Sequence, residues 1–230
     1  MARPSKSLIV RDAVVEAGLR IIDTEGLKAF SLPRLARELN VQAPSLYHHF
    51  KDKAEILQAV ARVIMLSTRL PDPKSVPNWI EWQVALSLAA RQSILRHRNA
   101  VPVLMQYMPR DVMINSYNNN ANCLREVGVP LDRLVVILDG LDKLTIGGAI
   151  SEALREFSDV GRPFGAVDAT TEPDLAQAVS ADPRSSTAVF AESIRRFLRG
   201  AAPEVPESAP PPNHWGSLDP IGGNRAWSTK

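Results

Sequence analysis

Cysteine is nearly absent from this chain, and so are the long apolar runs that mark membrane proteins. The single cysteine, Cys123, excludes an internal disulfide framework. No run of about 18 apolar residues occurs, so we expect no helix that crosses a membrane. The opening stretch MARPSKSLIVRDAVVEAG holds no long uncharged apolar core followed by a cleavage site. These absences favour a reducing, cytoplasmic setting and no membrane partner.

Motifs for catalysis are also missing. The chain has no glycine-rich phosphate loop, no nucleophile motif and no metal-ligand spacing, and its carboxylates are spread without a visible pair. We therefore predict that the protein is not an enzyme and uses no cofactor. What the chain does have is 45% hydrophobic residues over a length of 230, which is enough for a sizeable buried core.

The net charge of +2 is unevenly distributed along the chain. Residues 1–69 hold 11 Lys or Arg against 7 Asp or Glu, whereas residues 70–230 hold 16 against 18. A local basic excess is often only a solvated surface, but it is also expected of a module that contacts phosphates. Composition alone leaves both interpretations open.

Apolar residues at helical spacing predict helices along most of the chain, beginning with residues 10–26, which end at Gly26. In the next segment, FSLPRLARELN, Ser31 is suited to cap a helix, and Pro33 falls in the first turn, where its missing N–H is harmless. Asn40 ends this helix, since asparagine tolerates the left-handed conformation. Only residues 40–42 separate it from APSLYHHF, and so tight a turn is typical of a helix-turn-helix.

The second helix of this pair carries an unusual set of polar tips. Leu46 and Phe50 are four residues apart and can both face the core, which leaves the remaining side chains on the outside or at the rim. Hydroxyl, phenol, imidazole and ammonium groups can contact phosphate oxygens, and residues near the helix start can reach base edges. An ordinary surface helix is the alternative. A metal site at His48 and His49 is disfavoured, because adjacent helical residues point about 100° apart and no third ligand lies nearby.

Asp52 opens a further helix that we expect to run to about Leu70, with Glu55 three residues after the cap. Lys53 therefore lies beside a helix N-terminus, which favours phosphate through its unpaired N–H groups and its dipole.

Residues 13–57, AVVEAGLRIIDTEGLKAFSLPRLARELNVQAPSLYHHFKDKAEIL, resemble the DNA-binding domain of the tetracycline-repressor (TetR) family of bacterial regulators. The resemblance rests on an ordered set: Gly26, Leu35, Ala36, Val41, Leu46, Tyr47, Phe50 and Lys53. It implies an all-α protein in which an N-terminal three-helix helix-turn-helix domain is joined by a linking helix to a larger α-helical ligand-binding and dimerisation domain. We predict domains at 1–53 and 54–200, and a flexible Pro/Gly-rich tail at 201–230, which contains the isolated Trp215 and Trp227.

The resemblance also implies roles for single residues. Tyr47 and Lys53 match phosphate-contacting positions, and Ser45 matches a hydroxyl position on the recognition helix. Asn40 and Gln42 depart from the glycine and the capping serine that are common in the family. Pro33 occupies a position that carries a polar or basic DNA contact in some members, and any such contact must move to Arg34 or Arg37 or be absent. The predicted DNA-binding residues are Arg34, Arg37, Gln42, Ala43, Pro44, Ser45, Tyr47, His48, His49 and Lys53.

Further helices are predicted between residues 79 and 200, among them 111–128, with an apolar stripe of Ile114, Tyr117, Ala121 and Leu124. Methionines and aromatic residues between 79 and 157 make an adaptable apolar lining, although core packing alone explains such residues in most proteins. The resemblance favours a ligand pocket, with a polar Asn118 to orient the ligand. The predicted ligand-binding residues are Trp82, Leu86, Met105, Met108, Tyr117 and Asn118.

Two C-terminal helices are expected at residues 131–157 and 185–200, separated by a loop at about 158–183. The first contains Gly140, Gly147 and Gly148, where helices could approach closely. The resemblance implies that these two helices of each subunit form a four-helix dimer interface. Taken from their residues alone, both could equally be plain core helices.

These observations predict a ligand-responsive DNA-binding transcriptional regulator. We expect a repressor that binds a near-palindromic double-stranded DNA operator as a homodimer and is released by a small apolar or aromatic effector. The alternative is a helical protein-interaction module whose helix-turn-helix no longer binds DNA. Salt-dependent binding to promoter DNA distinguishes the two.

Overall fold

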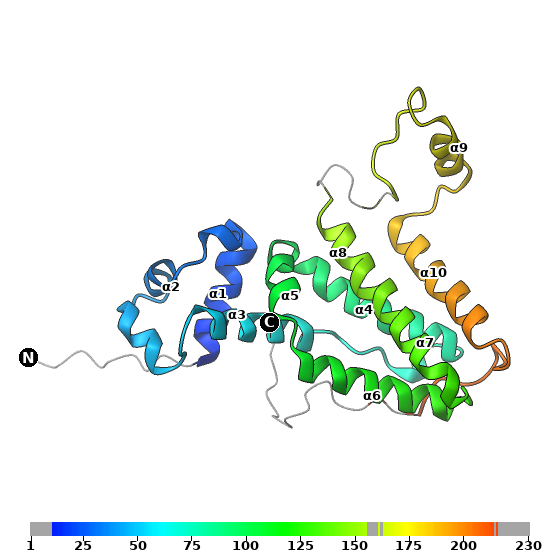
Figure 1. Cartoon of the computed structure of the whole chain (residues 1–230), viewed down its shortest axis with the longest axis horizontal. Coiled ribbons are helices and arrows are strands. Elements are labelled where there is room, and N and C mark those ends of the chain that lie inside the picture. Colours follow the sequence, from blue (N-terminus) through cyan, green and yellow to red (C-terminus); the bar gives the residue numbers. More distant parts are fainter. Residues whose placement is uncertain (1–10, 156–160, 162, 214, 216–230) are drawn as a thin grey trace, which may run out of the picture. The chain divides into compact units, whose positions relative to one another are not determined.

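The computed structural model describes residues 11–155, 161, 163–213 and 215, and the all-α prediction is confirmed (Figure 1). Within these residues no helix is long and apolar enough to cross a membrane. The α-helices are α1 (Arg11–Glu25), α2 (Leu32–Glu38), α3 (Lys53–Leu66), α4 (Trp79–Arg96), α5 (Val101–Tyr107), α6 (Arg110–Glu126), α7 (Leu131–Asp142), α8 (Gly148–Ala153), α9 (Pro173–Ala181) and α10 (Ser186–Ala201). Short 3₁₀ helices are η1 (Leu27–Ala29), η2 (Ala43–His48), η3 (Pro73–Ser75) and η4 (Arg98–Ala100), and a π-helical turn, η5 (Lys143–Gly147), joins α7 to α8.

The chain forms two compact units. Among the described residues, the N-terminal unit comprises 11–67 and 97–110, and the second unit comprises 68–96, 111–155, 161, 163–213 and 215. This division differs from the predicted boundary after residue 53, because α3 buries Ile56, Val60 and Ile64 in the N-terminal unit, where α3 packs on α1 and α5.

The η4 turn and α5 belong to the N-terminal unit although α4 separates them from it in sequence. The Asp23 carboxylate at the end of α1 lies 2.8 Å from His97 Nδ1, and the Asp23 carbonyl accepts a hydrogen bond from the Asn99 amide at 2.7 Å. Val101 and Leu104 of α5 are fully buried. Polar and apolar contacts together therefore fix residues 97–107 in this unit.

In the second unit, α10 packs on α4 and α7, and α4 packs on α8. Its core is a cluster that includes Trp79, Leu124, Ile137, Ile194 and Leu198. On α6 the structure confirms the predicted apolar stripe at Leu124, which is 1% exposed, and corrects it at Ile114, which is 54% exposed, whereas Val112 is buried. Ala121 of the same stripe packs against the core cluster, so the departure from the prediction lies at the N-terminal end of the stripe.

Of the three glycines at which helices could approach closely, Gly140 has the tightest contact. A Cβ added to Gly140 on α7 would lie 2.7 Å from Cε2 and 2.9 Å from Cε1 of Phe197 on α10. At Gly147 it would meet nothing within 4 Å. The α7–α10 contact is therefore the one that requires a missing side chain.

Two segments that we expected to be irregular are more ordered than predicted. The loop at about 158–183 contains α9, which begins at Pro173 and buries none of its own residues. The tail is not wholly flexible, because Ala202 and Val205 are buried and the backbone N–H of Trp79 donates to the Ala209 carbonyl at 3.1 Å. Proline lacks an N–H, so such a segment can pack through its carbonyls and apolar rings without forming a helix.

Candidate nucleic-acid interface

The first helix of the helix-turn-helix begins and ends as the sequence indicates. The Ser31 hydroxyl accepts a hydrogen bond from the Arg34 backbone N–H at 3.3 Å, and Pro33 lies in the first turn of α2. Asn40 adopts a left-handed conformation with φ 51°. The chain thereby reverses within three residues and presents η2 directly after α2.

The predicted recognition helix is a 3₁₀ helix, η2, rather than an α-helix. Gln42 occupies its cap position and makes no side-chain cap hydrogen bond, and Pro44 lies in the first turn. Runs of this tighter helix are short because its hydrogen-bond geometry is poorer. Leu46 and Phe50 are buried as predicted, at 1% and 2% exposure.

Because Leu46 and Phe50 are buried, the polar side chains of η2 point outward. The Tyr47 side chain is 58% exposed, His48 is exposed, and Ser45 and His49 are half-buried. At the start of η2, Gln42 and Pro44 are exposed and Ala43 is half-buried. A phenol, an imidazole and an amide therefore project from one short element.

Lys53 is held beside this surface by the N-terminal unit itself. Its ammonium donates to the Phe30 carbonyl at 2.8 Å and lies 5.3 Å from the centroid of the Phe30 ring. Asp52 caps α3 by accepting from the Glu55 N–H at 2.9 Å. The cation thus stands at the first residue of a capped helix, a place that favours an anion such as phosphate.

Arg34 is engaged within the protein. Its guanidinium forms ion pairs with Glu25 at 2.6 Å and Glu38 at 3.0 Å, and the hydrogen bonds to these carboxylates raise the pKa of Arg34. The hydrogen bond from Arg34 in turn lowers the pKa of Glu25. Arg37 is exposed on the same helix. Of the two arginines predicted for DNA contact, Arg37 is thus the less constrained.

Arg11 is a positioning residue that the sequence analysis missed. Its guanidinium donates to the His49 carbonyl at 2.5 Å, pairs with the Glu55 carboxylate at 2.7 Å and lies 4.1 Å from the centroid of the Phe50 ring. Glu55 also accepts the Lys51 backbone N–H at 2.7 Å. The first turn of α1 thereby clamps the end of η2 to the start of α3. These partners lie about 40 residues apart in sequence, so no local pattern shows them.

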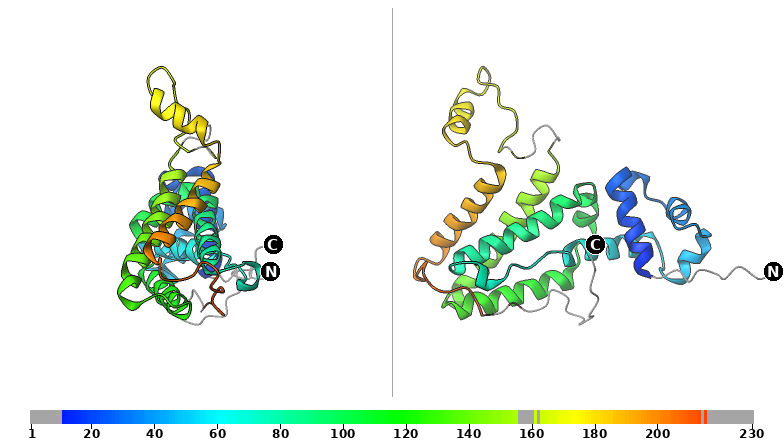
Figure 2. Two further views of the ribbon diagram at one scale, coloured as in Figure 1. Left: turned by 90° about the vertical axis from the view of Figure 1, so that its right-hand side faces the viewer. Right: turned by 180° about the vertical axis from the view of Figure 1, so that it is seen from behind.

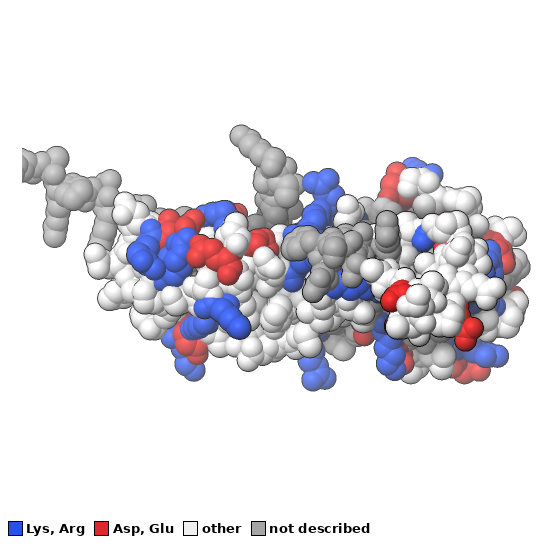
Figure 3. Space-filling view, turned by 90° about the horizontal axis from the view of Figure 1, so that it is seen from above, with Lys and Arg blue, Asp and Glu red and all other residues white. Residues whose placement is uncertain are grey.

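Basic residues in the N-terminal unit are mixed with acidic ones on the face that Figure 3 draws, where blue and red lie side by side. Phosphate recognition is therefore expected from single placed groups such as Lys53 rather than from a continuous basic patch. Among the described residues, no three His, Cys, Asp or Glu side chains are arranged to hold a metal ion.

The six predicted ligand-binding residues divide between the two units. Met105 and Met108 belong to the N-terminal unit, and Met105 is 64% exposed. In the second unit, Trp82 of α4 is fully buried and Leu86 is half-buried, while Asn118 of α6 is exposed. That all six residues line one ligand pocket remains a prediction.

Tyr117 is the member of this set with a defined polar partner. Its hydroxyl donates to the Asp142 carboxylate on α7 at 2.7 Å. Burial and this hydrogen bond raise the pKa of Tyr117, so the phenol stays neutral.

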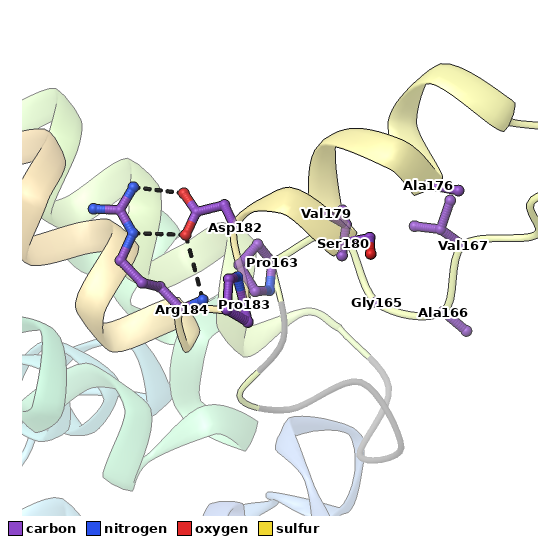
Figure 4. A pocket seen from close by; sticks show the side chains of 10 residues that line it. All are labelled: Pro163, Gly165, Ala166, Val167, Ala176, Val179, Ser180, Asp182, Pro183 and Arg184. Atoms are coloured by element: carbon purple, nitrogen blue, oxygen red, sulfur yellow. Dashed lines mark hydrogen bonds and ion pairs between the residues drawn. The ribbon is translucent and has the colours of Figure 1, made fainter.

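A pocket of about 440 Å³ lies between residues 163–167 and α9 and is drawn in Figure 4. At one end Arg184 pairs with Asp182 at 2.5 Å, and this contact lowers the Asp182 pKa to about 2. The described lining residues of this pocket include none of the six predicted ligand-binding residues.

Comparisons with known proteins decide the family. Residues 14–60 match the family described as bacterial regulatory proteins, tetR family. Over 194 residues the chain is 25% identical to the tetracycline repressor protein class A from transposon 1721 of Escherichia coli, and the match covers 83% of this chain and 89% of the relative. The chain belongs to the TetR family. The matched segment of this TetR-family protein contains α2, η2 and the start of α3, where the candidate interface lies.

Solved structures of TetR-family proteins share the fold. A possible TetR family transcriptional regulator from Streptomyces coelicolor A3(2) is 24% identical, with a TM-score of 0.64, and the match covers 83% of this chain and 98% of that one. The TetR family protein ActR of Streptomyces coelicolor, in complex with (S)-DNPA, is also 24% identical, with a TM-score of 0.62, and the match covers 87% and 100%. The similarity in fold between this TetR-family protein and the solved structures therefore extends beyond the helix-turn-helix.

Proposed function

We propose that the protein is a ligand-responsive transcriptional repressor that binds a near-palindromic DNA operator as a homodimer and is released by a small apolar or aromatic effector. The observation that carries this proposal is the display of Tyr47 and His48 on η2 beside the fixed ammonium of Lys53, within a TetR-family chain. Such a protein acts where the chromosome lies, which in a bacterium is the cytoplasm.

Residue roles follow from chemistry and placement. Tyr47 and Lys53 contact phosphates and set the position of the protein on the duplex, whereas His48 and the residues at the start of η2 reach base edges. Arg11 touches no DNA in this proposal. It acts by holding the His49 carbonyl and the Phe50 ring, and so the exit of η2.

A homodimer is supported by the outer face of α7. Leu131, Val135 and Val136 are 67%, 75% and 61% exposed within the single chain, whereas Leu134, Ile137 and Leu141 of the same helix are buried. Adjacent exposed apolar side chains of this size favour a protein–protein contact. Together with α10 they would form the four-helix interface, and two-fold symmetry would place two recognition elements about 34 Å apart on successive major grooves.

Effector control is supported by relatives crystallised with small molecules. ActR has been solved with (S)-DNPA and with actinorhodin, and a TetR variant of Acinetobacter baumannii with minocycline. In our proposal the effector binds the second unit and favours a dimer in which α3 has shifted. A hundredfold loss of DNA affinity needs about 2.7 kcal/mol of coupling, which is within the usual allosteric range.

Binding to the promoter region of its own gene tests the DNA-binding function. Lys53→Ala should weaken binding and reduce the slope of log affinity against log salt by about 0.9 for each phosphate that the variant no longer contacts, which is about 1.8 for a dimer. Tyr47→Phe should weaken binding to a smaller degree. The matched control is Lys74→Ala, which removes an exposed lysine from the second unit and should leave affinity and slope unchanged.

Binding-site selection separates positioning from base recognition. Lys53→Ala should select the parent motif, and His48→Ala should relax preference at one or two positions of each half-site. An unchanged affinity and salt slope for Lys53→Ala would remove the proposed phosphate contact. Absence of any salt-dependent promoter binding by the parent would instead favour the protein-interaction module.

A further inference from the structure

The C-terminal segment that follows α10 is anchored along α4 and α6 of the second unit (Figures 1 and 2). The Trp79 indole donates to the Pro206 carbonyl at 3.1 Å, and the Trp79 backbone N–H donates to the Ala209 carbonyl at 3.1 Å. Further along, the Asn213 amide donates to the Glu126 carboxylate at the end of α6. Residues 202–213 are thereby led from the end of α10 to α6.

This path brings Trp215 onto Trp82 of α4. Their ring centroids are 6.0 Å apart and the rings are inclined by 52°, which is a favourable tilted aromatic contact. The contact therefore gives a defined place to one of the two tail tryptophans that the sequence left unexplained.

Three polar atoms at this contact and on the next residue of α4 are buried without partners among the described residues. Among the described residues, the indole N–H groups of Trp82 and Trp215 and the amide oxygen of Gln83 have no hydrogen-bond partner. Trp82 is 0% and Gln83 is 2% exposed, and the Trp215 side chain is half-buried. Gln83 is oriented by its amide nitrogen, which donates to the Asn120 oxygen on α6 at 2.6 Å.

Unsatisfied donors of this kind are uncommon because they are costly. Leaving one buried donor or acceptor unpaired costs about 1–3 kcal/mol, and buried polar groups in native proteins nearly always have partners. The two indole rings are in contact, and the unpaired acceptor belongs to the residue that follows Trp82. Three unpaired polar atoms on these side chains favour a ligand that carries complementary groups.

We propose that Trp215 of the C-terminal segment, with Trp82 and Gln83 of α4, forms a binding site for a small planar aromatic compound that bears a carbonyl acceptor. The indole N–H groups donate to the carbonyl, and a hydroxyl on the same compound donates to Gln83. This inference rests on the proposed function, since it takes that compound as the effector class. To admit the compound, the segment at residues 203–213 must release its hydrogen bonds to Trp79 and Glu126.

The site makes Trp215 a specificity-determining residue, and a matched pair of probes tests this. 9-Fluorenone and fluorene have nearly the same planar shape, but only the ketone carries an acceptor. In equilibrium dialysis with the full chain, 9-fluorenone should bind at least about tenfold more tightly than fluorene, as expected when one buried donor gains its partner.

Trp215→Phe keeps an aromatic ring and removes the N–H. It should lower the preference for the ketone by at least about threefold, since only the Trp82 N–H then remains to donate, while fluorene binding is nearly unchanged. Trp227→Phe is the control, because it removes an indole from the same tail, and it should keep the full preference. Equal binding of the two probes to the parent, binding of neither, or an unchanged preference in Trp215→Phe would each overturn the site.

Promoter binding measured on the same preparation keeps this inference separate from the proposed function. Ketone preference without promoter binding would leave the site standing and refute the repressor. Promoter binding without ketone preference would refute the site alone.

Discussion

Gly140→Ala should destabilise the second unit, because α7 and α10 are in contact at this glycine. The added methyl would lie 2.7 and 2.9 Å from two carbons of the Phe197 ring and closer still to Cζ. Carbon atoms attract one another best at about 3.5–4.0 Å, so the ring or the helix must move. Phe197 is only half-buried, which allows some relief.

Two opposing effects set the magnitude. Inserting a methyl into a packed contact costs about 1–3 kcal/mol. Replacing glycine by alanine in a helix interior returns about 0.8–1 kcal/mol. We therefore expect the free energy of unfolding to fall by about 0–2 kcal/mol relative to the parent.

Gly147→Ala is the matched control. Its backbone is helical, with φ −61°, and an added Cβ would meet nothing within 4 Å. This variant should gain up to about 1 kcal/mol, so the two alanine variants should differ by about 1–3 kcal/mol. The comparison removes the helix propensity that both substitutions share.

Urea unfolding at one fixed protein concentration measures these differences, since a dimer's stability depends on concentration. Phe197→Leu combined with Gly140→Ala should recover part of the stability, which gives a coupling between the two sites. If Gly140→Ala is as stable as Gly147→Ala, the close approach of α7 and α10 at Phe197 is wrong.

Two further predictions concern the second unit. Val136→Asp should convert the dimer to monomers in light scattering at micromolar concentration, because it puts a charge into the proposed apolar interface, whereas Ile114→Asp on α6 should leave the dimer intact. The hydrogen bond from Arg195 lowers the pKa of Glu81 from 4.5, so its stabilisation is present above pH 4.5 and is lost as pH falls through the lowered value. Glu81→Gln should lose about 1 kcal/mol of unfolding free energy near pH 7, and its difference from the parent should shrink below about pH 4.5; a constant difference would contradict this pair.

The helix-turn-helix could be predicted from the sequence because the interactions that form it are local. A serine cap at Ser31, a left-handed Asn40 and a four-residue spacing between Leu46 and Phe50 each act over one or two turns. Such features leave a mark within a short window, and all three are present in the structure. The tight 3₁₀ form of η2 was not predicted, because Pro44 and the absent side-chain cap change the helix type without changing the apolar spacing.

Contacts between residues far apart in sequence could not be predicted from short stretches of the chain and are seen only in the tertiary structure. The Arg11–Glu55 pair joins residues 44 apart, and the Trp79–Pro206 hydrogen bond joins residues 127 apart. A proline-rich tail reads as unpacked by composition, yet its carbonyls and rings find partners on α4. Helix periodicity predicts which face is apolar but not which helix covers it. For that reason the division into units and the partner of Trp215 had to come from the fold.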